Sequence, residues 1–138
     1  MKISLRAGEK IYMNGAVFSV DRRVSLRLLN DVTFLLESHV MQAAEATTPL
    51  RKIYFAVQTM LMEPDASKAI RMSALHMIET LLSGMQGRSE RALLEKVGAL
   101  LGSGRSFDAL REVRELYRME EANRLTALAE LKESTPCN

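Results

Sequence analysis

Apolar and polar residues alternate in short runs along the first 40 residues, and turn residues end each run. This period of two is typical of strands with one buried face. Asn14 and Gly15 separate two of the runs and favour a tight hairpin, because both residues tolerate a positive φ angle. The pattern predicts four or five strands, at residues 3–5, 11–13, 16–20, 24–28 and 32–36.

The spacing of apolar residues changes from two to that of a helix near residue 45. Thr48 and Pro49 predict the start of the first helix, because threonine caps a first turn and proline lacks an N–H that would need a partner there. Apolar residues then follow at helical spacing as far as Pro64. The start residues predicted for three further helices are Asp65, Ser89 and Ser106. The inward-facing residues predicted for the last helix are Leu110, Val113, Tyr117, Leu128 and Leu131.

Together these patterns predict the α+β class, with a small N-terminal antiparallel β-meander or barrel-like sheet followed by a bundle of about four helices. Residues 1–44 would form a β-rich, RNA-binding module, and residues 45–133 a helical region for partner binding or oligomerisation. Residues 134–138 would form a disordered tail, because they have nothing to bury. The length of 138 residues suits one compact unit.

The distribution of charge is more informative than its total. A net charge of +2 is small for a nucleic-acid-binding protein. Residues 1–36 nevertheless carry six Lys or Arg side chains against three Asp or Glu, so the basic excess lies at the N-terminal end. The single cysteine, Cys137, allows no intramolecular disulfide, and no apolar run approaches the length of a membrane span. We therefore expect a soluble, cytoplasmic protein without membrane contact.

Residue patterns for catalysis or metal binding are missing from the sequence. His39 and His76 have no other metal-binding residue at ligand spacing. The glycines at 102 and 104 follow a helical pattern, whereas a phosphate-binding loop comes between a strand and a helix. No serine lies in the sequence context of a nucleophile elbow. We expect a protein that is not an enzyme and has no metal, no cofactor and no small-molecule substrate.

The basic strand region is chemically suited to RNA. Arginines in turns and at strand edges bind phosphates, and sequence-specific readers of RNA commonly target unpaired bases. Arg22 and Arg23, together in a turn, are the first candidates for phosphate contacts, and Tyr12 could stack on a base. The alternative is a solvated turn on an ordinary sheet surface, with Tyr12 used for packing. The candidate RNA-binding residues are Lys10, Tyr12, Arg22, Arg23, Arg27, Arg51 and Lys52.

Three segments of the chain resemble the FlbT family of flagellar regulators. They are residues 12–17 (YMNGAV), 21–23 (DRR) and 46–58 (ATTPLRKIYFAVQ), and the third is the most specific. The resemblance implies a protein that binds the 5′ untranslated leader of flagellin messenger RNA and represses its translation or promotes its degradation. In some relatives the effect is activation. The resemblance also implies a working relationship with FlaF, a small partner protein from the same system.

A second hypothesis is a helical adaptor or chaperone that binds flagellin or FlaF and affects translation indirectly. The weak net charge and the nine methionines, flexible side chains that suit adaptable protein-binding surfaces, favour this alternative. The family's effect on the message and the basic N-terminal segment favour direct RNA binding. A homodimer is also expected to be possible, because exposed edges of a short sheet can pair with a second copy.

Overall fold

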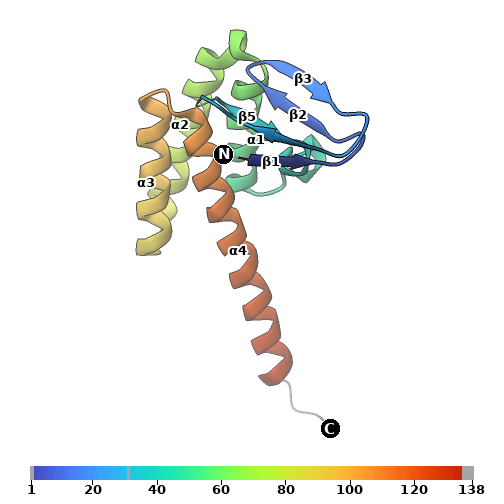
Figure 1. Ribbon diagram of the computed structural model, residues 1–138. Coiled ribbons are helices and arrows are strands. Elements are labelled where there is room, and N and C mark those ends of the chain that lie inside the picture. The colour runs from blue at the N-terminus through green and yellow to red at the C-terminus, as the bar shows by residue number, and fades with distance from the viewer. Residues whose placement is uncertain (1, 31, 135–138) are drawn as a thin grey trace.

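Two small antiparallel sheets form the N-terminal part of the computed structural model, which describes residues 2–30 and 32–134 (Figure 1). Strand β1 (Lys2–Leu5) pairs with β4 (Val24–Arg27). In the second sheet, β2 (Lys10–Met13) lies between β3 (Ala16–Ser19) and β5 (Phe34–Leu36). The α+β class expected from the sequence is therefore confirmed.

The hairpin between β2 and β3 forms where Asn14 and Gly15 predict it. Their φ angles are 52° and 82°, which is the left-handed pair that a type I′ turn requires. The remaining strands do not follow a simple meander, because β1 skips its neighbours in sequence and pairs with β4. With this crossing, the apolar faces of the two sheets cover each other.

The sheets and helices form three layers. The first core lies between the two sheets and contains the buried side chains of Ile3, Leu5 and Ile11. On the opposite face of the middle sheet, Leu35 and the half-buried Tyr12 pack into the main core with the helices. The pair of strands β1 and β4 is therefore the outermost layer, with one face on the middle sheet and the other in solvent.

Four α-helices follow the strands in the order expected, with two short 3-10 turns before α1 and a third between α1 and α2. Helix α1 (Pro49–Met62) packs against α2 (Ser67–Gly84) and α4 (Ser106–Ser134), and α3 (Arg88–Gly102) also contacts α2 and α4, so the helices close a ring. The 3-10 turns are Glu37–His39, Ala43–Glu45 and Pro64–Ala66.

The predicted helix starts are partly right. The Thr48 hydroxyl accepts a hydrogen bond from the Arg51 N–H at 3.2 Å and Pro49 opens α1, so that start is confirmed, as is the start of α4 at Ser106. Asp65 belongs to a 3-10 turn before α2. The cap predicted at Ser89 is wrong, because α3 already begins after Gly87 without a side-chain cap.

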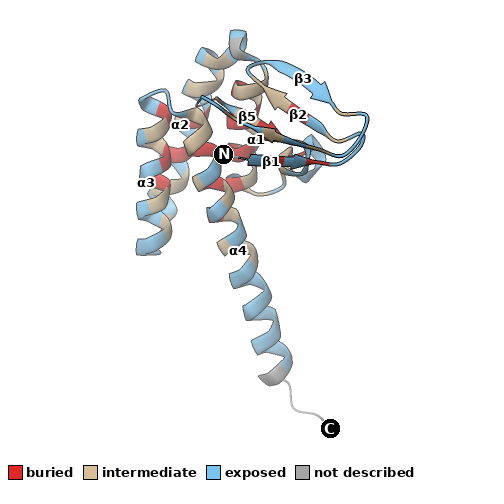
Figure 2. Ribbon diagram, in the orientation of Figure 1, coloured by how far each residue is buried: buried red, intermediate tan, exposed pale blue. Residues whose placement is uncertain are grey.

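The orientation predicted for the end of α4 is also wrong. Leu110 and Val113 are buried in the main core as expected, but Leu128 and Leu131 are 47% and 63% exposed. The other helices end beside the first half of α4, so its second half extends beyond them into solvent (Figure 2). Residues 135–138, including Cys137 and most of the predicted disordered tail, lie outside the described residues.

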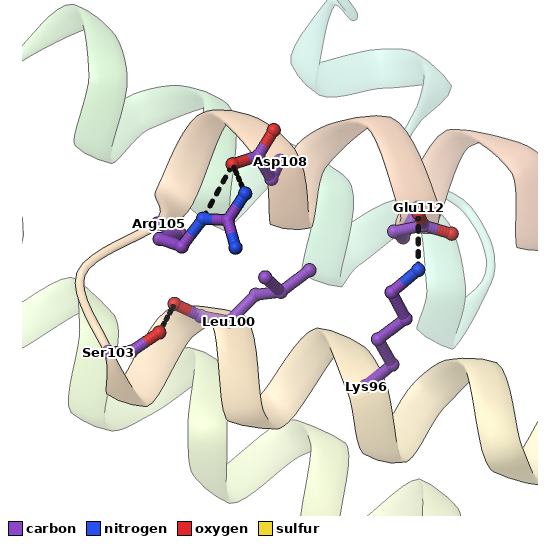
Figure 3. Close-up of polar contacts among 6 residues, drawn as sticks. All are labelled: Lys96, Leu100, Ser103, Arg105, Asp108 and Glu112. Atoms are coloured by element: carbon purple, nitrogen blue, oxygen red, sulfur yellow. Dashed lines mark hydrogen bonds and ion pairs between the residues drawn. The ribbon is translucent and has the colours of Figure 1, made fainter.

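The tight connection between α3 and α4 fixes the position of the fourth helix (Figure 3). Gly104 takes a φ angle of 82°, which favours glycine at this turn. Arg105 Nε donates to Asp108 Oδ2 at 2.9 Å, and Lys96 Nζ donates to Glu112 Oε1 across the two helices at 3.2 Å. Exposed ion pairs of this kind add little stability, so the buried apolar contacts between α3 and α4 dominate their packing.

Candidate nucleic-acid interface

The solvent-facing side of β1 and β4 is basic and carries hydroxyl groups. Side chains alternate along both strands, so Lys2 and Ser4 of β1, and Ser25 and Arg27 of β4, are exposed together on this side. In the antiparallel register Lys2 lies opposite Arg27, and Ser4 opposite Ser25. We call this surface the outer ribbon face.

Two more arginines extend the outer ribbon face. Arg6 follows β1 and Arg23 precedes β4, both are exposed, and both continue the alternation of their strand. Three alternate positions on each strand therefore carry Lys or Arg at both ends and Ser in the middle, which makes six positions on the surface. Lysine, arginine and serine are all common donors to phosphate oxygens.

The cations of the outer ribbon face lack anionic partners. Within the described part of the chain, Lys2, Arg6, Arg23 and Arg27 make no ion pair within 4 Å. Lys2 and Arg27 lie directly opposite each other. Like charges in this position destabilise an antiparallel pair of strands. The face therefore has a local surplus of positive charge that bound anions would relieve.

Only some of the candidate residues from the sequence lie at this surface. Arg23 and Arg27 belong to the outer ribbon face, and Arg22 is exposed in the adjoining turn, 3.8 Å from the carboxylate of Asp21. Lys10 is exposed on β2, in the middle sheet, where its backbone N–H donates to Glu37 Oε2 at 2.9 Å.

The other three candidates lie elsewhere. Tyr12 packs towards the helices, on the side of the middle sheet that faces away from the outer ribbon. Arg51 lies over the ring of Tyr117, 5.6 Å from its centroid, and 3.7 Å from the Glu121 carboxylate. Lys52 is exposed on α1. These three side chains are not brought together with the turn arginines, and we leave them out of the interface.

A shallow cavity of about 840 Å³ adjoins the end of the outer ribbon face. Its wall begins at Leu28, directly after Arg27, and continues through the loop to Phe34. The start of α4 forms the other wall, where the Phe107 ring lies 5.5 Å from that of Phe34. Arg105, Asp108 and Arg111 also line the cavity, and because Arg105 pairs with Asp108, Arg111 supplies the positive charge at this end of the ribbon.

The Tyr54 side chain connects the helices to the segment that follows β5. The Tyr54 hydroxyl donates a hydrogen bond to the His39 carbonyl oxygen, and burial raises the pKa of Tyr54 to about 12, with the nearby Tyr117 hydroxyl adding to the rise. Burial, together with the positive charges of Arg114 and Arg118, lowers the pKa of His39. Both side chains are therefore neutral at pH 7, and the Tyr54 hydroxyl bonds the His39 backbone at this junction.

The outer ribbon face also contains residues that were not among the RNA-binding candidates, and their alternation in the sequence could have indicated them. Lys2, Ser4 and Arg6 occur at alternate positions, as do Arg23, Ser25 and Arg27. Each set predicts one polar strand face, but only the pairing of β1 with β4 places the two sets side by side. A meander would have separated them.

The described residues contain neither a metal-binding cluster nor a helix that could cross a membrane. No cluster of three or more His, Cys, Asp or Glu side chains among residues 2–30 and 32–134 is arranged to hold a metal ion. Over the same residues, no helix combines the length and apolar character needed to cross a membrane.

The fold and this surface define a small α+β protein with a cationic β-ribbon packed on a second sheet, which packs in turn on a layer of helices. The sequence model of the family described as "Flagellar protein FlbT" matches residues 1–123. The chain belongs to this FlbT family.

Curated relatives support the same assignment. A protein of Chelativorans sp. (strain BNC1) is 48% identical over 120 residues, which cover 87% of this chain and 83% of the relative. A protein of Rhizobium leguminosarum bv. trifolii (strain WSM2304) is 47% identical over 121 residues, covering 88% and 81%. Both are named "Probable flagellum biosynthesis repressor protein FlbT". No solved structure matches the chain.

Proposed function

We propose that this chain regulates flagellum biosynthesis after transcription, by binding the 5′ untranslated region of flagellin messenger RNA through the outer ribbon face. The coarser role, regulation of flagellar expression, follows from membership of the FlbT family and from the names of its relatives. The observation that supports RNA as the target is the group of cations that have no anionic partner among the described residues, Lys2, Arg6, Arg23 and Arg27.

The geometry suits an unpaired strand of RNA. Phosphate contacts from the four cations would fix the position of the backbone, and such contacts carry no sequence information themselves. Selectivity would come from bases read beside the ribbon, for which the adjoining cavity offers polar groups and the rings of Phe34 and Phe107. A leader held in this way is less accessible to ribosomes, so repression of translation, followed by degradation of the message, is the expected effect. This action belongs in the cytoplasm.

The first test is a titration of the purified full-length chain with the flagellin leader RNA and with a scrambled RNA of the same composition, at two salt concentrations. We expect tighter binding to the leader and weaker binding at high salt, because binding to phosphates releases counterions. Equal, weak binding to both RNAs would contradict the proposal.

Variants then locate the interface. The double variant Arg23→Ala, Arg27→Ala should lose about tenfold or more in affinity, and the slope of log K against log salt should fall by about 0.7 for each phosphate contact removed. Lys68→Ala, Arg88→Ala is the matched control, because it removes two exposed cations from helices away from the ribbon. Equal losses of RNA affinity in the two variants would reject the outer ribbon face as the binding site. An Arg22→Ala, Arg23→Ala variant with normal RNA affinity would reject it as well.

The alternative function is that of an adaptor that binds flagellin or a FlaF-type partner through its helices. The exposed side chain of Met72 on α2, 68% accessible, is the specific feature that favours it. Repeating the titration with and without FlaF separates the two functions. Tight binding to FlaF or flagellin, with no preference for the leader RNA, would favour the adaptor.

A further inference from the structure

The second half of α4 extends away from the rest of the protein (Figures 1 and 2). Leu116 is the last residue of the helix that is buried, and every residue from Ala122 to Lys132 is exposed. At a rise of about 1.5 Å per residue, this projecting segment is roughly 15–20 Å long. Most helical stability in proteins comes from packing, so a partner surface would stabilise this exposed segment.

One side of the projecting segment is apolar. Leu125 and Leu128 are 55% and 47% exposed, and Ala122 and Ala129 lie three residues before and four residues after Leu125, on the same side of the helix. We call these four residues the apolar stripe. Asn123 and Glu130 lie on the opposite side. Exposed leucines that line up along a helix are typical of a surface that packs against a second helix.

We propose that the apolar stripe is the contact surface of a homodimer, in which two α4 helices pair antiparallel about a two-fold axis near residues 126 and 127. This arrangement places Leu125 against Leu128 of the partner subunit, and the symmetry repeats the contact. Alanines at 122 and 129 leave room for the two helices to approach closely.

Charge favours the antiparallel direction over the parallel one. Glu121 stands half-buried at the base of the stripe, where its carboxylate lies 3.7 Å from Arg51 and 2.6 Å from Arg124 of the same chain, and Lys132 stands exposed near the far end. Antiparallel pairing brings Glu121 opposite Lys132 of the partner subunit, twice in the dimer. Parallel pairing would instead bring Glu121 to the partner's Glu121 and Lys132 to the partner's Lys132, and like charges facing each other are unfavourable.

The limits of the family match favour a second copy as the partner. The match ends at residue 123, so most of the stripe lies beyond the part of the chain that the family model matches. A second copy necessarily carries the same stripe. The two helices would overlap over about three turns, and the area that this overlap buries is smaller than the roughly 1,600 Å² of a standard interface. We therefore expect a dissociation constant in the micromolar range.

Sedimentation of the full-length chain from low micromolar to several hundred micromolar tests the dimer. The wild type should pass from monomer to dimer over this range. Leu125→Glu, Leu128→Glu should remain monomeric with an unchanged circular dichroism spectrum, because these side chains are outside the core. The matched control Asn123→Glu, Ala127→Glu, on the opposite side, should dimerise as the wild type does. A wild type that stays monomeric, or a control that loses dimerisation equally, would overturn the proposal.

Charge reversal tests the direction of pairing. Lys132→Glu should weaken the dimer about tenfold, because two glutamates then face each other. Adding Glu121→Lys should restore part of the affinity, because opposite charges face each other again, although the new lysine lies beside Arg51 and Arg124 of its own chain. Parallel pairing predicts little change for Lys132→Glu, since it would replace a contact between two lysines with one between two glutamates. A Lys132→Glu dimer as strong as that of the wild type, or stronger, would therefore overturn the antiparallel arrangement. Neither experiment depends on RNA binding, so the outcome is independent of the proposed function.

Discussion

Two buried polar side chains hold the segment between the sheets and the first helix. Gln58 is only 3% exposed, and its amide makes two hydrogen bonds with the backbone of Met41: Oε1 accepts from the N–H at 2.6 Å and Nε2 donates to the carbonyl oxygen at 2.9 Å. The sequence predicted Tyr54 as part of the apolar side of α1. It did not predict a role for Gln58, because a single polar residue in a helix pattern is indistinguishable from a solvated one until its distant partner is known.

Replacing Gln58 with leucine should destabilise the protein by about 2 kcal/mol or more. The apolar side chain fills a similar volume but leaves the buried N–H and carbonyl of Met41 without partners, and each unsatisfied group costs about 1–3 kcal/mol. Urea denaturation followed by circular dichroism measures the change. Gln86→Leu is the control, since Gln86 is exposed. Equal stability of the two variants would mean that water replaces the lost hydrogen bonds.

At the scale of elements, the sequence predicts local structure better than pairing. The turn at Asn14 and Gly15 and the start of α1 at Thr48 depend on neighbouring residues, and both are where the sequence places them. The pairing of β1 with β4 depends on contacts between segments some 20 residues apart, which alternation alone does not specify. The outward direction of Leu128 was missed for a related reason: helical spacing shows that leucines share a side, but not whether another element covers it.

The cap of α1 can be tested by Thr48→Ala. The variant removes the acceptor of the Arg51 N–H at the first turn, and the expected loss is about 1 kcal/mol. Thr47→Ala is the matched control, because Thr47 is exposed and one residue outside the cap. Denaturant midpoints for the two variants and the wild type give the comparison. A loss at Thr47 as large as that at Thr48 would show that the cap contributes nothing specific.

For the whole molecule, the two cores differ greatly in size. Three buried side chains lie between the sheets, against sixteen in the main core, so the outer ribbon should open more easily than the helices. The sequence indicated the cationic N-terminal region but not this layering, because both cores draw on β2, whose alternate residues face opposite ways.

Hydrogen exchange followed by mass spectrometry should reveal this difference. Peptides from β1 and β4 are expected to exchange much faster than peptides from α1. Saturating leader RNA should slow exchange in β1 and β4 while leaving α3 unchanged, because phosphates neutralise the opposed Lys2 and Arg27. Equal exchange in β1 and α1 without RNA would contradict the layered stability, whereas unchanged exchange on adding RNA would count against the ribbon as its binding site.

The contribution of α4 to the main core also affects how the protein is made. Tyr117 of α4 packs edge to face on Tyr54 of α1, with ring centroids 5.3 Å apart, and Leu116 is fully buried. At about 5–20 residues per second, the ribosome needs roughly 3–11 s to synthesise the chain between Met60 and Leu116. For that interval the apolar side of α1 has no fourth helix to cover it. The basic strands are thus synthesised first, but the helical layer on the other side of the middle sheet is completed only when α4 emerges.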